Sequence, residues 1–222
     1  MALLRSVNLA SAAPNPHTSK RDTGIDKRSV GKTVEVRDPG PKGTGLGSGL
    51  VGDFIGDAAH HGGSDQAVYA FAREDLDDWQ LRLRRELPDG FFGENLTTDD
   101  LDISDARIGE RWQIGDSVVL QVTCPRIPCS TFRGWVGEVG WLKMFTRVAR
   151  PGTYLRVVSP GTIRAGDAID VVHRPSHRVS VSMVFRAVVT WPELLPGLLE
   201  AGADLSDELR ETVASRKTFR LD

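Results

Sequence analysis

The residues best suited to chemistry stand in one short segment, Pro125-Arg126-Ile127-Pro128-Cys129-Ser130. Arg126 places a permanent positive charge close to Cys129, and a neighbouring guanidinium lowers the pKa of a thiol. Pro125 and Pro128 each have a fixed backbone φ angle, and both precede Cys129. The direction of the sulfur is therefore set by the backbone as well as by packing. The segment therefore predicts a thiolate that is aimed at a ligand or a reacting group.

A second cluster of chemically useful residues is His60-His61-Gly62-Gly63. Adjacent side chains on an extended backbone point in opposite directions, so only one of the two histidines is expected to face a ligand. Glycines let the backbone approach a ligand closely, and successive free amides can bind an anion. A plain glycine turn that joins two strands is the alternative interpretation.

The other cysteine, Cys124, is interpreted as structural. A disulfide between Cys124 and Cys129 is disfavoured because two prolines lie within so short a loop. A zinc site that combines both cysteines with His60 and His61 is also disfavoured, since the spacings are not those of common structural zinc motifs. The chemistry is therefore expected to depend on Cys129.

Most of the elements that must position these residues are predicted to be short strands. Closely spaced strands with turn residues between them indicate a barrel or a sandwich instead of βαβ units. The strands are expected near residues 1–9, 34–36, 67–71, 112–115, 117–122, 154–158 and 168–172.

One long helix is predicted after residue 71, because Leu76, Trp79, Leu83 and Leu87 form a single apolar stripe that ends at Pro88. The five glycines of residues 43–52 favour either a disordered loop or a lid over a site.

The domain boundary is expected near residue 190. Residues 1–190 are predicted to form the β domain, and residues 191–222 a small helical appendage used for packing or dimerisation. Ser206 is predicted to cap the last helix of this appendage.

Composition limits the classes of partner. The chain has 222 residues, of which 40% are hydrophobic and 26% charged, as in an ordinary globular protein. Its 28 basic and 30 acidic residues nearly balance, so no overall field attracts nucleic acid or an anionic membrane. No apolar run is long enough to span a bilayer, and a cytoplasmic location is expected. The sequence has no dinucleotide-binding glycine fingerprint and no phosphate-binding P-loop.

Eight stretches follow one another along the chain: Gly52-Asp53, His60 to Val68, Gly90 to Thr97, Ile108 to Trp112, Pro125 to Cys129, Arg156-Val157, Gly161 and Ala165 to Asp167. Taken in this order, they resemble those of a MOSC domain, the C-terminal module of molybdenum cofactor sulfurases, and most closely its stand-alone YiiM-like branch. The chain departs from the family at Gln66, where lysine is common, and after Cys129, where many relatives have a basic residue.

The resemblance implies a mainly β fold, a MOSC-type β-barrel with a few helices. It also implies binding of the molybdenum cofactor, a molybdopterin, with Cys129 as the metal ligand or as a sulfur carrier. Catalytic roles are expected for Cys129, His61 and Arg126. Lys27 and Lys42 are further candidates for contacting the cofactor phosphate, and Asp53 is expected to pair with a site cation such as Arg126. The expected cofactor contacts are His60, Gly62, Gly63, Asp53, Glu94, Asn95 and Arg156.

Three functions are compatible with this resemblance. The first is reduction of N-hydroxylated bases or amidoximes, with 6-hydroxylaminopurine as the representative substrate. It requires a separate electron-donating reductase, because the sequence has no flavin or nicotinamide motif. The second is a sulfur carrier that receives a persulfide on Cys129 from a cysteine desulfurase, an enzyme that uses pyridoxal phosphate. The third is a small-molecule-binding barrel without turnover.

Overall fold

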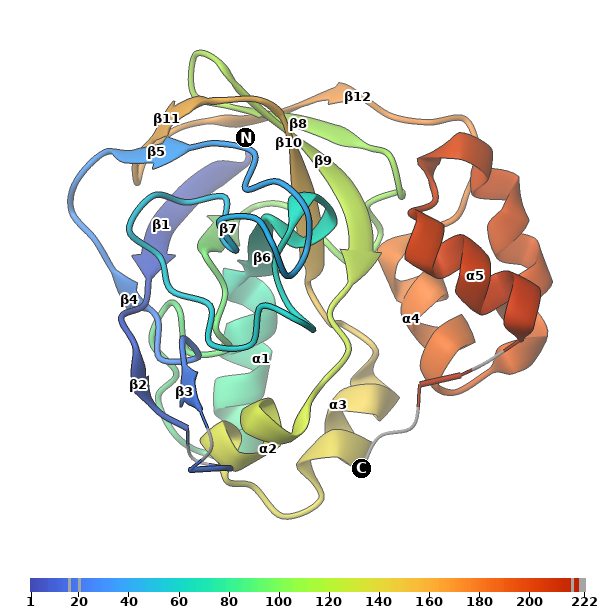
Figure 1. The fold of residues 1–222 in the computed structure, drawn as a ribbon, viewed down its shortest axis with the longest axis horizontal. Coiled ribbons are helices and arrows are strands. Elements are labelled where there is room, and N and C mark those ends of the chain that lie inside the picture. The colour runs from blue at the N-terminus through green and yellow to red at the C-terminus, as the bar shows by residue number, and fades with distance from the viewer. Residues whose placement is uncertain (16, 20, 217, 220–222) are drawn as a thin grey trace.

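The computed structural model describes residues 1–15, 17–19, 21–216 and 218–219. Its main feature is an eight-stranded sheet with the strand order β12-β8-β9-β10-β6-β7-β1-β4 (Figure 1). Two further pairs of strands, β2 with β3 and β5 with β11, lie outside it. The strands are β1 (Leu3–Leu9), β2 (Ala13–Pro14), β3 (Asp22–Thr23), β4 (Arg28–Ser29), β5 (Val34–Val36), β6 (Val68–Ala72), β7 (Leu96–Asp99), β8 (Arg111–Ile114), β9 (Val118–Pro125), β10 (Thr153–Ser159), β11 (Gly161–Ile163) and β12 (Ile169–His173).

The mainly β character predicted from the sequence is confirmed, and each predicted strand overlaps an observed one. Neighbouring strands of the main sheet run antiparallel except for β6 and β7, which run parallel. The helix α1 (Arg73–Leu83) connects these two, since parallel neighbours need a crossover of a dozen or more residues. The sheet therefore contains one βαβ unit, which the spacing of the strands did not predict.

A closed barrel, in contrast, is not found among the described residues. The strand order has two ends, β12 and β4. An isolated antiparallel bridge joins Leu3 to Ala168, just before β12, and the backbone N–H of Leu4 donates to the carbonyl of Asp167 over 2.8 Å. The start of β1 is thus joined to the residues just before β12 by one bridge and a few hydrogen bonds. These residues do not form a further pair of strands, because β12 begins only at Ile169.

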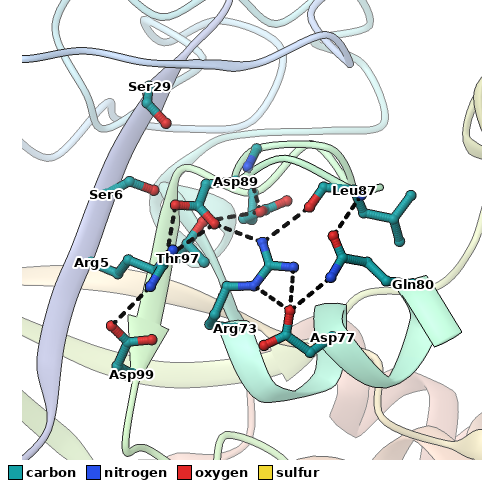
Figure 2. A network of polar contacts seen from close by, with 12 residues as sticks. Arg5, Ser6, Ser29, Arg73, Asp77, Gln80, Leu87, Asp89, Thr97 and Asp99 are labelled. Carbon is teal, nitrogen blue, oxygen red and sulfur yellow. Dashed lines mark hydrogen bonds and ion pairs between the residues drawn. The ribbon is translucent and has the colours of Figure 1, made fainter. Parts of the chain in front are cut away.

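The helix α1 is shorter than its apolar stripe predicted. It ends at Leu83, and Arg84 adopts a left-handed conformation with φ +52°. Leu87 lies beyond the helix but is still buried. The Arg73 guanidinium donates a hydrogen bond to the Leu87 carbonyl over 3.0 Å, and the Gln80 side-chain oxygen accepts the Leu87 N–H over 2.8 Å (Figure 2). Side-chain hydrogen bonds thus turn the chain back against α1.

An aromatic cluster supports the segment that follows β9. The buried ring of Phe92 contacts the rings of Phe71, Phe132 and Trp141 at centroid distances of 5.1 to 5.4 Å. Phe132 belongs to α2 (Ser130–Val136) and Trp141 to α3 (Trp141–Val148). Burial of several large rings contributes strongly to stability, so these contacts fix the start of α2 against the rest of the protein.

The C-terminal helices α4 (Val181–Val189) and α5 (Asp207–Ser215) pack with the 3₁₀ segment η2 (Pro192–Asp204) at one side of the molecule (Figure 1). The predicted cap is confirmed, since the hydroxyl of Ser206 accepts the N–H of Leu209 over 3.3 Å. Apolar residues of these helices join the same buried cluster as the sheet. The boundary at residue 190 and a dimerising role stay predictions.

The glycine-rich residues 43–52 are held against the sheet at their C-terminal end. The Gly49 carbonyl accepts the N–H of Arg37 over 2.8 Å, and the Gly49 N–H donates to the carbonyl of Ala67 over 2.7 Å.

None of the helices in the described part of the chain is long and apolar enough to cross a membrane.

Candidate functional site

Cys129 lies at the junction between β9 and α2. The strand ends at Pro125, and the helix begins at Ser130, so Cys129 occupies the N-cap position with extended backbone angles of φ −108° and ψ 172°. Its side chain is half-buried and packs against the aromatic cluster. The two prolines and the fixed start of α2 together determine where the sulfur points.

The surroundings of Cys129 favour the ionised form. Burial opposes ionisation, but a hydrogen bond from His61 and the positive charges of Arg126 and His61 outweigh it and lower the pKa of Cys129 to about 6. The backbone N–H of Phe132 adds to this effect. The thiol is therefore mostly a thiolate at neutral pH, as the sequence predicted from Arg126, although the largest favourable contribution comes from His61.

Arg126 is almost completely buried beside the sulfur. Its guanidinium donates a hydrogen bond to the carbonyl of Phe92 and stacks on the rings of Phe132 and Tyr69 at 4.0 and 5.1 Å. Burial acts to lower the pKa of Arg126, but the neighbouring Tyr69, Tyr154 and Cys129 raise it overall. Arg126 therefore stays charged, and its position is fixed by contacts that the sequence analysis did not identify.

These unforeseen contacts come from three places in the chain. Phe92 lies between two glycines, Tyr69 lies in β6, and Phe132 follows Cys129 by three residues. The sequence contained a signal only for the first, because an aromatic pair between Gly90 and Gly93 marks a tight, packed turn. Both glycines have positive φ angles, 89° and 77°.

The two histidines have different surroundings. His60 is exposed and pairs with Asp57 over 3.1 Å, and Asp57 also pairs with Arg21 over 2.8 Å. His61 is half-buried and reaches the sulfur of Cys129. Both backbone N–H groups donate to the carbonyl of Asp57, so the histidines lie in a turn and not on an extended strand. Of the two, the structure brings His61 to Cys129.

Gly62 and Gly63 are required by packing within the protein. Both have φ +80°, and a Cβ atom at these positions would lie 2.5 Å from the Gly47 carbonyl oxygen and 2.6 Å from the Lys42 nitrogen, respectively. The N–H of Gly63 already donates to Gly47 over 3.0 Å. Their close approach is therefore to the glycine-rich segment, and a contact with a cofactor stays a prediction.

Asp53 pairs with Lys27 and not with Arg126. The Asp53 carboxylate lies 2.5 Å from the Lys27 amine, and both side chains are buried. The same carboxylate accepts hydrogen bonds from the backbone of Ala10 (2.9 Å), the hydroxyl of Ser48 (2.8 Å) and the amide of Asn95 (2.9 Å). Burial lowers the pKa of Lys27, although the Asp53 charge opposes this. Lys27 is therefore part of a buried ion pair instead of a surface contact for phosphate.

Asn95 is fully engaged inside the protein. Its side-chain oxygen accepts the N–H of Tyr69 over 3.1 Å, and its amide nitrogen donates to Asp53 and to the carbonyl of Asn8. These bonds connect β6 with β1, which lie on either side of β7 in the sheet. Asn95 thus supports the sheet next to the site.

Glu94 is completely buried and bonds to its own loop. One carboxylate oxygen accepts the N–H of Gly90 over 2.6 Å and the hydroxyl of Thr97 over 3.0 Å. The other oxygen is buried without a hydrogen-bond partner among the described residues. Burial raises the pKa of Glu94 to about 7, although these hydrogen bonds oppose the shift. Asp89, just before Gly90 in the same loop, pairs with Arg73 of α1 over 2.8 Å (Figure 2).

The raised pKa of Glu94 predicts a pH-dependent stability difference. Because the folded state holds this proton up to about pH 7 and the unfolded state loses it near pH 4.5, the free energy of unfolding falls as the pH rises between these values. Relative to the wild type, Glu94→Gln should gain up to about 3 kcal/mol between pH 4.5 and 8, measured by urea unfolding. Glu86→Gln, in an exposed glutamate, serves as the control. Parallel pH curves for wild type and Glu94→Gln would contradict the assignment.

The remaining basic candidates are each paired with a carboxylate. Arg156 pairs with Asp65 through two of its nitrogens, and Lys42 pairs with Glu208 over 3.0 Å. Cys124 is the other free cysteine, and burial raises its pKa to about 12. The described residues contain no group of three or more His, Cys, Asp or Glu side chains that could hold a metal ion by themselves.

Comparison with known proteins gives the family. The model of the MOSC domain matches residues 57–170. A protein named Reductase from Gibberella moniliformis is 33% identical over 145 residues, which cover 64% of this chain but only 26% of that protein. The uncharacterized protein YflK of Bacillus subtilis is 29% identical over 182 residues, 82% of this chain and 78% of YflK.

A solved structure shares the fold. The crystal structure of YiiM from Geobacillus stearothermophilus superimposes with a TM-score of 0.77 at 24% identity, over 97% of this chain and 99% of that one. The family match spans the turn of His61, the loop of Glu94 and the segment of Cys129. The chain belongs to the MOSC domain family.

Proposed function

We propose that the protein is a molybdenum-cofactor-dependent oxidoreductase that reduces small N-hydroxylated substrates, such as N-hydroxylated bases or amidoximes. The observation that carries the proposal is the half-buried Cys129 thiolate, which lies next to His61 and Arg126 and has a pKa of about 6. A thiolate of this kind is a soft ligand that suits a sulfur-bound metal. The fungal relative named Reductase supports an oxidoreductase, although the chain spans only about a quarter of its length.

The donor set at Cys129 fits one end of the cofactor. Cys129 would hold the metal, and the dithiolene sulfurs of the pterin would complete its ligands. When bound, this cofactor supplies two-electron chemistry that can remove oxygen from a nitrogen atom. The three basic residues expected to contact the cofactor phosphate are each paired with a carboxylate of the protein. These residues are Lys27, Lys42 and Arg156.

The chain's own residues would contribute charge and a proton. Arg126 stabilises negative charge at the sulfur from a position fixed by Phe92 and Phe132. The His61 side chain forms a hydrogen bond with that sulfur, so it is placed to donate a proton to the oxygen that leaves the substrate. With two cysteines and no flavin or nicotinamide motif, the chain needs a separate reductase as its electron donor.

Metal analysis tests the proposal. The protein should be expressed in cells that make the molybdenum cofactor, and its molybdenum content should be measured together with the reduction of 6-hydroxylaminopurine by a chemical reductant. We expect close to one molybdenum per chain in the wild type and in Cys124→Ala, and almost none in Cys129→Ala. Full metal content in Cys129→Ala would contradict the proposal.

The same proteins distinguish the second candidate function. A nucleophilic thiolate with a low pKa also suits a sulfur carrier. After incubation with a pyridoxal-phosphate-dependent cysteine desulfurase and cysteine, mass spectrometry would show one added sulfur atom on Cys129. Stable persulfide on Cys129 in a protein that takes up no molybdenum would favour the sulfur carrier over the reductase.

A further inference from the structure

The hairpin formed by β2 and β3 is fastened to the element that holds Cys129. In Figure 1 it lies at the same side of the molecule as α2. The amide nitrogen of Asn15, directly after β2, donates a hydrogen bond to the hydroxyl of Thr131 over 3.1 Å, and the Asn15 oxygen accepts the N–H of His17 over 2.9 Å. Thr131 lies in the first turn of α2, two residues after the cysteine. One end of the hairpin is therefore joined to the start of α2.

The other strand of the hairpin is fastened to the turn that carries His61. Arg21, directly before β3, pairs with the carboxylate of Asp57 over 2.8 Å. The same carboxylate lies 3.1 Å from the ring of His60, and the backbone carbonyl of Asp57 accepts the N–H groups of both histidines over 3.1 and 2.9 Å. The ring of His61 forms the hydrogen bond with the sulfur of Cys129. Arg21 therefore holds the residue around which this turn is built.

Close backbone contacts hold the hairpin against the same segment. A Cβ atom at Gly56 would lie 2.0 Å from the carbonyl oxygen of Asp22, and one at Gly24 would lie 1.9 Å from the carbonyl oxygen of Phe54. Both distances are shorter than non-bonded atoms can approach, so glycine is required at these two positions. The strand β3 thus runs directly beside residues 54–56, and the ion pair between the hairpin and the turn stays within reach.

The charges around Asp57 keep its carboxylate ionised. Burial acts to raise the pKa of this carboxyl, but the hydrogen bond with His60 and the positive charges of Arg21 and of both histidines lower it overall. The carboxylate is therefore charged at neutral pH, when Arg21 is charged as well. The Asp57 side chain is only 16% exposed, so this ion pair is screened less than a pair between two exposed groups.

We infer that Arg21 and Asn15 are positioning residues of the candidate site. Through them, the β2–β3 hairpin sets the distance between the turn of His61 and the start of α2, and so keeps the imidazole hydrogen-bonded to the sulfur of Cys129. A hairpin with no chemical motif of its own therefore supports the ionised thiol. The inference rests on the proposed function only for the reaction that this thiol serves, since a sulfur carrier would need the same pair of residues.

A double-mutant cycle tests this role in the full-length protein without bound metal. Arg21→Ala should slow the alkylation of Cys129 by iodoacetamide at pH 7 by roughly threefold, which is within the range expected for loss of a partly exposed ion pair. In a His61→Phe background the same substitution should leave the rate unchanged, because the imidazole that it positions is absent. Arg21→Lys, which keeps the positive charge, should retain most of the wild-type rate. Asn15→Ala should also slow alkylation in the wild type and not in His61→Phe.

Arg28→Ala is the matched control, because it removes an ion pair of similar length, 2.7 Å to Asp26, from β4 instead of from the hairpin. This control should leave the alkylation rate unchanged. If Arg21→Ala or Asn15→Ala leaves the wild-type rate unchanged, or slows alkylation equally with and without His61, the inference is overturned for that residue.

Molybdenum content, measured on protein expressed together with the cofactor, separates the inference from the proposed function. A cycle in which Arg21→Ala acts only through His61, in a protein that never takes up molybdenum, overturns only the proposed function. Equal effects in both backgrounds, in a protein with normal molybdenum content, overturn only the inference.

Discussion

Asp53→Ala is expected to lower the free energy of unfolding by about 3 to 5 kcal/mol, because removal of one partner leaves a buried charge without compensation. The Lys27 amine would lose the carboxylate at 2.5 Å. Ser48 and Asn95 would lose their acceptor at the same time. Urea unfolding followed by circular dichroism measures the change.

Asp65→Ala is the matched control, since it removes the carboxylate of the partly exposed Arg156 pair and should cost less than about 1 kcal/mol. The double variant Lys27→Met with Asp53→Leu should recover part of the stability that Asp53→Ala loses, because no unpaired charge then remains. If Asp53→Ala costs no more than Asp65→Ala, the buried ion pair does not have the role described here.

His61→Phe is expected to slow the alkylation of Cys129 at pH 7 by roughly tenfold, because loss of the hydrogen bond and of the imidazole charge returns the thiol toward its ordinary pKa of about 8.5. The imidazole provides the largest favourable contribution to the thiolate. Arg126 remains in this variant, so part of the thiolate should persist. The rate is measured with iodoacetamide and mass spectrometry of the peptide that contains Cys129.

The adjacent His60→Phe variant is the control for this experiment. His60 is exposed and bonded to Asp57, so its replacement should leave the alkylation rate of Cys129 unchanged. Equal rates for wild type and His61→Phe would mean that the imidazole does not hold the sulfur in its ionised form. Equal losses in both variants would indicate a general disturbance of the turn at residues 57–61.

Much of the fold could be predicted from local patterns. Strands such as Val118–Pro125 show in the sequence as short apolar runs between turn residues. The early end of α1 could not be predicted, since Leu87 continues the apolar spacing and is buried, but side chains of Arg73 and Gln80 hold it outside the helix. The absence of a closed barrel among the described residues could not be predicted either. It depends on how residues near Leu3 pair with residues near Ala168, far apart in the chain.

The candidate site shows a similar division. Cys129 and Arg126 could be paired from the sequence because only two residues lie between them. The pairing of Asp53 with Lys27 could not be predicted from the sequence. Nothing in the sequence shows which lysine or arginine the fold will bury beside this carboxylate. For Gly62 and Gly63 the sequence left both a ligand contact and a plain turn open. The fold fills the space beside each with the protein's own backbone, and a cofactor contact there stays a prediction.

The pH dependence of Cys129 alkylation in the unmodified protein is the most direct test of the central claim, that this sulfur is a thiolate at neutral pH. Protein without bound metal would be treated with iodoacetamide between pH 4.5 and 10, and both cysteine peptides would be quantified. We expect a half-maximal rate for Cys129 near pH 6, with Cys124 almost unreactive below pH 10. A half-maximal rate near pH 8.5 or above for Cys129, as for an ordinary thiol, would contradict it.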